Sequence, residues 1–138
     1  MRKLISLLLI VVLFCSCIMP ASAAVKEEAE LFWNKIYNIY ASISVNESTG
    51  IVTCTGTVTA KNTYPVEVFV QLQILENGSW RTLKSWTNTG TLSASVTKNY
   101  AVYSGYTYQV YVIGYVYDNN GNIVESGSEY HSVYYPSN

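Results

Sequence analysis

The sequence predicts an all-β protein with about seven antiparallel strands in an immunoglobulin-like two-sheet sandwich. Apolar and polar residues alternate with period two from residue 38 onward. Clusters of Asn, Asp, Ser and Gly separate these runs at roughly the 8- to 12-residue spacing of such sandwiches. Valine, threonine and most of the thirteen tyrosines, all good strand formers, fill the runs. A small antiparallel barrel would show the same alternation and stays open as the alternative.

The first 23 residues have the three parts of a secretory signal peptide. Arg2 and Lys3 supply the positive charge, residues 4–14 the apolar run, and Ala21-Ser22-Ala23 the small-residue cleavage site. The mature protein is expected to begin at Ala24 and to be secreted or extracellular. The apolar run is about half as long as a membrane span, so a retained transmembrane helix is disfavoured. No other stretch is long and apolar enough to replace it, so no stable membrane insertion is expected after cleavage.

A lipid anchor is the alternative to secretion in free form. Cys15 and Cys17 follow the apolar run, where a lipoprotein signal would carry its modified cysteine. Such a cysteine usually follows small residues, whereas Phe14 lies immediately before Cys15. Removal of both cysteines with the signal is therefore preferred. Cys54 is then the one cysteine left, and the mature chain has no internal disulfide.

The mature chain of about 115 residues is enough for one domain. It divides into a short segment over residues 24–37 and a β-sandwich domain over residues 38–138. Six of the eight basic residues remain after cleavage, against nine acidic ones. The basic residues of the strand region are spread singly and form no patch, so nucleic acid is not an expected partner.

Residues 24–37 have a spacing compatible with a short helix. Apolar residues recur at three- and four-residue intervals at Ala29, Phe32, Trp33, Ile36, Tyr37 and Tyr40. A segment that packs on the domain is the preferred interpretation. A membrane-lying or partner-binding helix is the alternative, which the acidic rather than basic polar residues disfavour.

The first three strands follow from alternation. Residues 39–45 and 52–58 are expected as strands joined by turn residues 46–50, and residues 66–74 have the cleanest apolar face. In the second strand, Val52, Cys54, Gly56 and Val58 are expected to face the core, opposite a row of threonines. The third strand presents Glu67, Phe69, Gln71 and Gln73 on its other face.

The middle of the chain contains a hairpin and a short strand. Asn77-Gly78 predicts a type I′ turn, so residues 80–87 should return along the third strand. The orientation of that strand is ambiguous, because Trp80 and Trp86 share one face and Leu83 the other. Residues 92–96 are then expected to form a short strand that loses its register near Lys98.

The last hairpin carries most of the tyrosines. Residues 106–116 and 123–135 are expected as its strands, with Asp118 to Gly121 as the turn. Tyr106 and Tyr108 are expected to pack inward. The candidate binding residues are Tyr111, Tyr115 and Tyr117 on the other face, with Tyr130, Tyr134 and Tyr135 on the partner strand. Such rings can stack on sugars or anchor a protein partner, and ordinary cross-strand packing is the alternative.

Several short motifs resemble a family of small secreted proteins of unknown function, found mainly in Gram-positive bacteria. The motifs are Leu72-Gln73, Asn77-Gly78-Ser79-Trp80, Ser85-Trp86, Gly105-Tyr106-Thr107-Tyr108, Val116-Tyr117-Asp118, Asn120-Gly121 and Val124-Glu125-Ser126, with Cys54 in the second strand. The resemblance extends over residues 38–135. It implies an exported β-sandwich with no established activity and brings no catalytic or binding residues.

Catalytic and metal-binding patterns are weak. A cysteine nucleophile needs a thiolate beside a histidine, and Cys54 and His131 are the candidates, yet Cys54 is expected in the core. Asp118, Asn120, Asn122 and Glu125 offer oxygen ligands without the spacing of a calcium-binding EF-hand loop. No phosphate-binding loop, dinucleotide-binding motif or G-x-S-x-G nucleophile motif occurs. No catalytic residue, metal or cofactor is therefore predicted.

The sequence favours a secreted, non-enzymatic binding module for an extracellular protein or glycan. A secreted antimicrobial or toxin-like effector is the first alternative, although the acidic mature chain would be repelled by anionic lipids. A small hydrolase is the second alternative.

Overall fold

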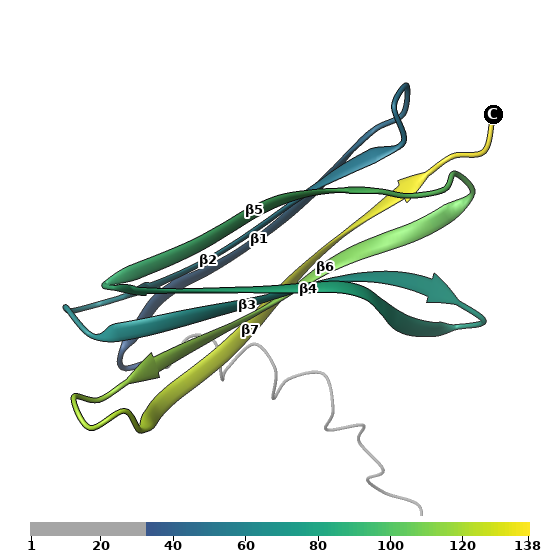
Figure 1. The fold of residues 1–138 in the computed structure, drawn as a ribbon. Helices are drawn as coiled ribbons and strands as arrows, with labels where there is room; N and C mark the ends of the chain where they lie inside the picture. The colour runs from purple at the N-terminus through teal and green to yellow at the C-terminus, as the bar shows by residue number, and fades with distance from the viewer. Residues whose placement is uncertain (1–32) are drawn as a thin grey trace, which may run out of the picture. The chain divides into compact units, whose positions relative to one another are not determined.

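The computed structural model describes residues 33–138, which form seven antiparallel strands and contain no helix (Figure 1). The strands are β1 (Ile36–Asn46), β2 (Ile51–Ala60), β3 (Pro65–Glu76), β4 (Ser79–Thr91), β5 (Ser93–Ala101), β6 (Tyr106–Tyr117) and β7 (Ile123–Tyr135). The signal peptide and residues 24–32 lie outside the described residues.

The strands form two sheets. One has the order β1-β2-β5 and the other β4-β3-β6-β7. Across residues 33–138 the sheets remain separate rather than closing into a barrel, so the two-sheet sandwich is confirmed. The fourth strand pairs with the third, whereas constant-type immunoglobulin domains pair it with the fifth.

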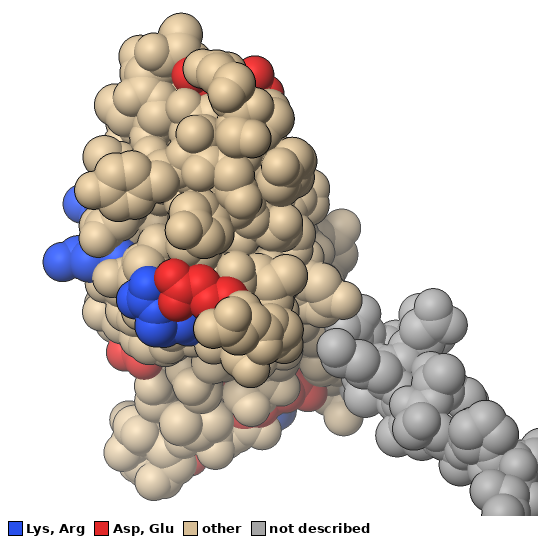
Figure 2. Space-filling model, turned by 90° about the vertical axis from the view of Figure 1, so that its right-hand side faces the viewer, with Lys and Arg blue, Asp and Glu red and all other residues tan. Residues whose placement is uncertain are grey.

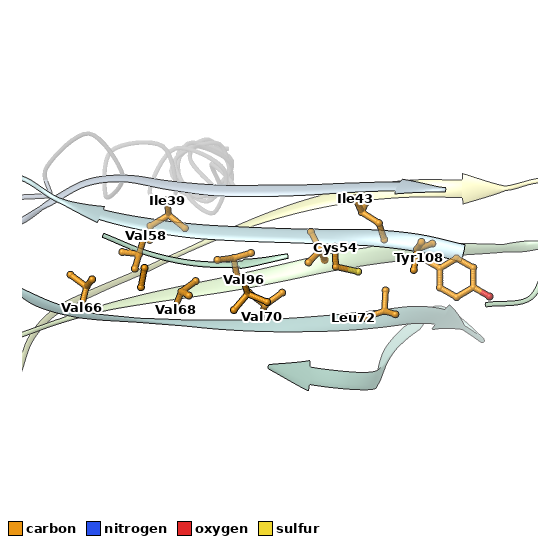
Figure 3. Close-up of a cluster of buried hydrophobic side chains, with 14 of the residues drawn as sticks. Ile39, Ile43, Cys54, Val58, Val66, Val68, Val70, Leu72, Val96 and Tyr108 are labelled. Carbon is orange, nitrogen blue, oxygen red and sulfur yellow. The ribbon is translucent and has the colours of Figure 1, made fainter. Parts of the chain in front are cut away.

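The core lies between the sheets and follows the predicted alternation. Cys54 and Val58 on β2 point toward β3, whose Val68, Val70 and Leu72 point back (Figure 3). Each of these side chains is fully buried, because every second residue of a strand faces the same side.

Two inward-facing glycines bring the sheets close together. A Cβ atom on Gly56 would lie 2.4 Å from Cγ2 of Val70, and one on Gly114 would lie 2.5 Å from Cγ2 of Val58. Valines of the opposite sheet thus occupy the space that a side chain would need. The two positions therefore require glycine for close packing rather than for backbone freedom.

A bulge in β4 explains the ambiguous orientation of that strand. Thr82 pairs with Gln73 and Lys84 with Leu72, so Leu83 is the extra residue. The bulge reverses the alternation. Trp86, opposite Val70, therefore packs against the core, while Trp80, opposite Leu75, lies on the outer face.

The expectation of a helix over residues 24–37 is wrong for residues 33–37, the part that the structure describes. Ile36 and Tyr37 belong to β1, and residues 33–35 are not helical. Ile36 is buried in the core, and the strand has an irregularity between Ile36 and Asn38. Pairing with β2 thus extends this strand toward the N-terminus beyond the alternating run.

The register expected to break near Lys98 does not break. Lys98 lies opposite Cys54, and β5 continues in register to Ala101. Leu92 was expected in this strand but lies at the corner between β4 and β5 with a φ of 70°. Its backbone donates to the Tyr64 carbonyl and accepts from the Ala60 N–H, which holds the corner.

Candidate functional site

Five of the six candidate tyrosines lie on the outer face of the β4-β3-β6-β7 sheet, away from the core. Strand register places Tyr111 beside Gln71 of β3 on one side and Tyr130 of β7 on the other. Tyr115 lies between Glu67 and Ser126. Because these strands are adjacent, side chains far apart in the sequence form one surface.

The structure also places apolar and amide side chains among these rings. Phe69 of β3 lies directly opposite Ile113 of β6, between the Tyr111 and Tyr115 rows. We call the surface formed by Tyr111, Tyr115, Tyr117, Tyr130, Tyr134, Phe69 and Ile113 the tyrosine face. Alternation along β3 predicts that Phe69 faces away from the core. Phe69 could therefore have been identified from the sequence as a residue of this surface.

The rings of the tyrosine face differ in exposure. Tyr130 and Tyr134 are 55% and 57% exposed, whereas Tyr111, Tyr115 and Tyr117 are half-buried among their neighbours. The Tyr117 hydroxyl donates to Oε1 of Glu67 at 3.4 Å. Burial, and then the Glu67 charge, raise the pKa of Tyr117. A ligand would therefore meet Tyr130 and Tyr134 first.

A row of amides adjoins the rings. Nε2 of Gln109 donates to Oε1 of Gln73 at 2.9 Å, and Nε2 of Gln73 is 3.3 Å from Oε1 of Gln71. The Ser132 hydroxyl donates to Gln109 at 3.3 Å. These contacts fix uncharged donors and acceptors beside the aromatic rings.

Tyr135 does not belong to this surface, so its inclusion among the binding residues is wrong. It is buried, and its hydroxyl donates to the carbonyl of Glu47 at 3.0 Å. Adjacent residues of a strand point to opposite faces, and Tyr134 already faces outward. The inward orientation expected for Tyr108 is confirmed, whereas Tyr106 is exposed.

Cys54 and His131 do not form a nucleophile and base. Cys54 is fully buried, and burial raises the pKa of its thiol to about 11, so the thiol is protonated at neutral pH. His131 is exposed, and its Nδ1 accepts a hydrogen bond from the Ile43 N–H at 3.2 Å. The histidine therefore contacts the edge of β1.

The oxygen-rich turn after β6 is organised around Asp118. Its Oδ1 accepts from the backbone N–H groups of Asn120 and Asn122, both at 2.9 Å. These bonds lower the pKa of Asp118, the Asn122 N–H contributing most. In residues 33–138 no group of three or more His, Cys, Asp or Glu side chains is placed to hold a metal ion.

The outer face of the other sheet is built from hydroxyl groups. Thr53, Thr55, Thr57 and Thr59 of β2 contact Asn99, Thr97, Ser95 and Ser93 of β5 at 2.8 to 3.4 Å. Three of these pairs join two hydroxyls across the strands, and in the fourth Thr53 donates to the amide oxygen of Asn99. Tyr40 of β1, opposite Thr57, is an exposed ring on this face.

No protein-family model matches this chain, and no curated protein matches it significantly. Within residues 33–138 no helix is both long enough and apolar enough to cross a bilayer.

Proposed function

We propose that this protein is a secreted, non-enzymatic binding module with an immunoglobulin-like sandwich, and that its tyrosine face binds an extracellular glycan. The observation that carries the proposal is the exposure of Tyr130 and Tyr134 on the sheet face that also carries Tyr111, Phe69 and Ile113. A soluble protein rarely leaves such a cluster of rings exposed unless it contacts a partner.

The chemistry of this face favours a glycan over a protein. Tyrosine rings can stack on the apolar faces of sugar rings, and amides can both donate to and accept from sugar hydroxyls. Gln71 and Gln73 supply such amides next to the rings, and the buried Gln109 holds Gln73 in place. Glu67 is the carboxylate nearest the rings, at the Tyr117 end. A largely uncharged surface suits a neutral ligand.

Secretion is proposed from residues 1–23, whose charged start, apolar run and cleavage site are typical of exported proteins. The resemblance to small secreted proteins of Gram-positive bacteria supports the same location. The acidic mature chain disfavours an effector that acts on anionic membranes. The buried Cys54 thiol disfavours a cysteine hydrolase.

A glycan array probed with residues 24–138 tests the proposal. We expect saturable binding to neutral glycans, with little dependence on ionic strength because no charge pairing is involved. Binding that requires an anionic glycan and disappears in salt would contradict the proposal. If no glycan binds and a purified secreted protein binds saturably to the tyrosine face, the glycan proposal is wrong and the partner is a protein.

A further inference from the structure

A cleft of about 490 Å³ opens at the end of the sandwich that carries the β3–β4 hairpin. Figure 2 looks onto this end and shows a surface with few acidic or basic groups. Ile74 and Leu83 line the cleft from β3 and β4, and Tyr100 and Val102 line it from the side of β5. Its volume lies within the range of about 300 to 1,000 Å³ that holds small ligands.

The charged groups of the cleft neutralise each other. Arg81 donates to Glu76 through two nitrogens, at 2.8 and 2.9 Å. This bidentate pairing lowers the pKa of Glu76 and raises that of Arg81, so both stay ionised at neutral pH. A charged ligand would have to compete with this pair, whereas an uncharged one leaves it intact.

The aromatic part of the cleft is held in place by its own hydrogen bonds. The Tyr108 hydroxyl donates to the Tyr103 carbonyl at 2.6 Å and accepts from the Tyr103 N–H at 3.1 Å. Tyr106 contacts Tyr108 edge to face at 6.4 Å between ring centres. The Tyr103 ring nevertheless remains 83% exposed. The lining of the cleft is thus mainly aromatic and aliphatic surface, with a smaller share of polar groups.

We propose that this cleft binds a small uncharged aromatic molecule of about two fused rings, which packs between Leu83 and Val102 and contacts the rings of Tyr103 and Tyr106. The site is distinct from the tyrosine face, which lies on the outside of the four-stranded sheet. Offset or edge-to-face contacts with tyrosine rings favour an aromatic ligand over an aliphatic one of equal size. A sugar would have to compete for the polar groups of Tyr108, Glu76 and Arg81, which are already paired.

An NMR titration of residues 24–138 with 2-naphthol tests this proposal. We expect saturable shifts of the Ile74, Leu83 and Val102 methyl groups. Tyr103→Ala, at an exposed position that should not affect folding, should weaken binding about fivefold through loss of a ring contact. Tyr106→Ala, which removes the other ring contact at a position that is 42% exposed, should weaken it by a similar factor. Tyr134→Ala on the tyrosine face is the matched control and should leave the affinity unchanged.

Three results would overturn the proposal. They are the absence of saturable shifts, shifts centred on the tyrosine face, and equal affinity in the wild type and both cleft variants. Tighter binding of the anion 2-naphthoate, lost in Arg81→Gln, would also overturn it, because the ligand class would then be anionic. Since glycan binding is measured on the other surface, this proposal and the proposed function can fail independently.

Discussion

Glu125 on β7 accepts a hydrogen bond from the backbone N–H of Ile36 on β1, with 2.6 Å between Oε2 and N. The same carboxylate accepts from the N–H groups of Asn34 and Lys35, each at 2.8 Å. β1 and β7 are edge strands of different sheets. One side chain therefore fixes residues 34–36 to β7 and joins the two sheets along that side.

The neighbouring contact reinforces this junction. A Cβ atom on Gly127 would lie 2.5 Å from Cζ2 of Trp33, so the indole lies directly against the β7 backbone. Lys61 also donates to the Trp33 carbonyl through its ammonium group. Trp33 thus packs on the sandwich although it precedes the alternating run.

Replacing Glu125 with glutamine should destabilise the fold by about 1 to 3 kcal/mol, because an amide oxygen cannot accept all three N–H groups as a carboxylate does. Urea denaturation measures the loss. Glu47→Gln, at an exposed turn position, is the control and should change stability by less than about 0.5 kcal/mol. Equal denaturation midpoints for the two variants would show that the Glu125 contacts are not stabilising.

The stabilisation by Glu125 should depend on pH in a defined direction. Burial raises the pKa of Glu125, but the N–H donors of Ile36, Asn34 and Lys35 together outweigh it and lower the pKa below its ordinary 4.5. A carboxyl with a lowered folded pKa stabilises the fold above its unfolded pKa, and this stabilisation is lost as the pH falls through the folded pKa. The stability difference between wild type and Glu125→Gln should be full near about pH 7 and shrink below about pH 4. A difference independent of pH would contradict this assignment.

The Cys54 thiol should be unreactive in the folded protein. Its pKa of about 11 and complete burial keep it protonated and inaccessible. A thiol reagent should label it slowly without denaturant and rapidly in denaturant. Cys54→Ala should cost about 1 to 2 kcal/mol through lost core packing. Rapid labelling under native conditions would mean that β2 is shifted by one residue.

Adding a methyl group at Gly56 should destabilise the sandwich. Gly56→Ala would place a Cβ atom 2.4 Å from Val70, so the sheets or side chains must move, at a cost of about 1 to 3 kcal/mol. Thr55→Ala, on the outer face of the same strand, is the control and should cost less than about 1 kcal/mol. Thermal denaturation measures both. Equal melting temperatures would show that the sheets are not packed at this distance.

The sequence was sufficient to predict the features that depend on alternation alone. The all-β class and the inward faces of β2 and β3 are confirmed, as is the positive φ at Asn77 and Gly78 expected of a type I′ turn. The error at Tyr135 could also have been avoided, since it cannot share a face with Tyr134. Alternation is a local signal that the sequence displays directly.

Features that depend on distant residues could not be predicted. The strand conformation at Ile36 accompanies contacts with Glu125, some ninety positions away, which no local pattern displays. The bulge at Leu83 depends on pairing with β3. The outward orientation of Phe69 was predictable from alternation, but its place beside Ile113 of β6 was not. The cleft likewise combines residues of four strands.

The most direct test of the proposed function is a binding titration, with a neutral glycan selected on the array, of the double variant Tyr130→Ser/Tyr134→Ser. Both rings are more than half exposed, so the melting temperature should stay within a few degrees of the wild type. Binding should weaken by about 2 kcal/mol or more, roughly thirtyfold in Kd. Tyr40→Ser is the matched control, because Tyr40 is 51% exposed on the outer face of the other sheet. Undiminished binding by the double variant, or an equal loss in Tyr40→Ser, would contradict the assignment of the tyrosine face as the binding surface.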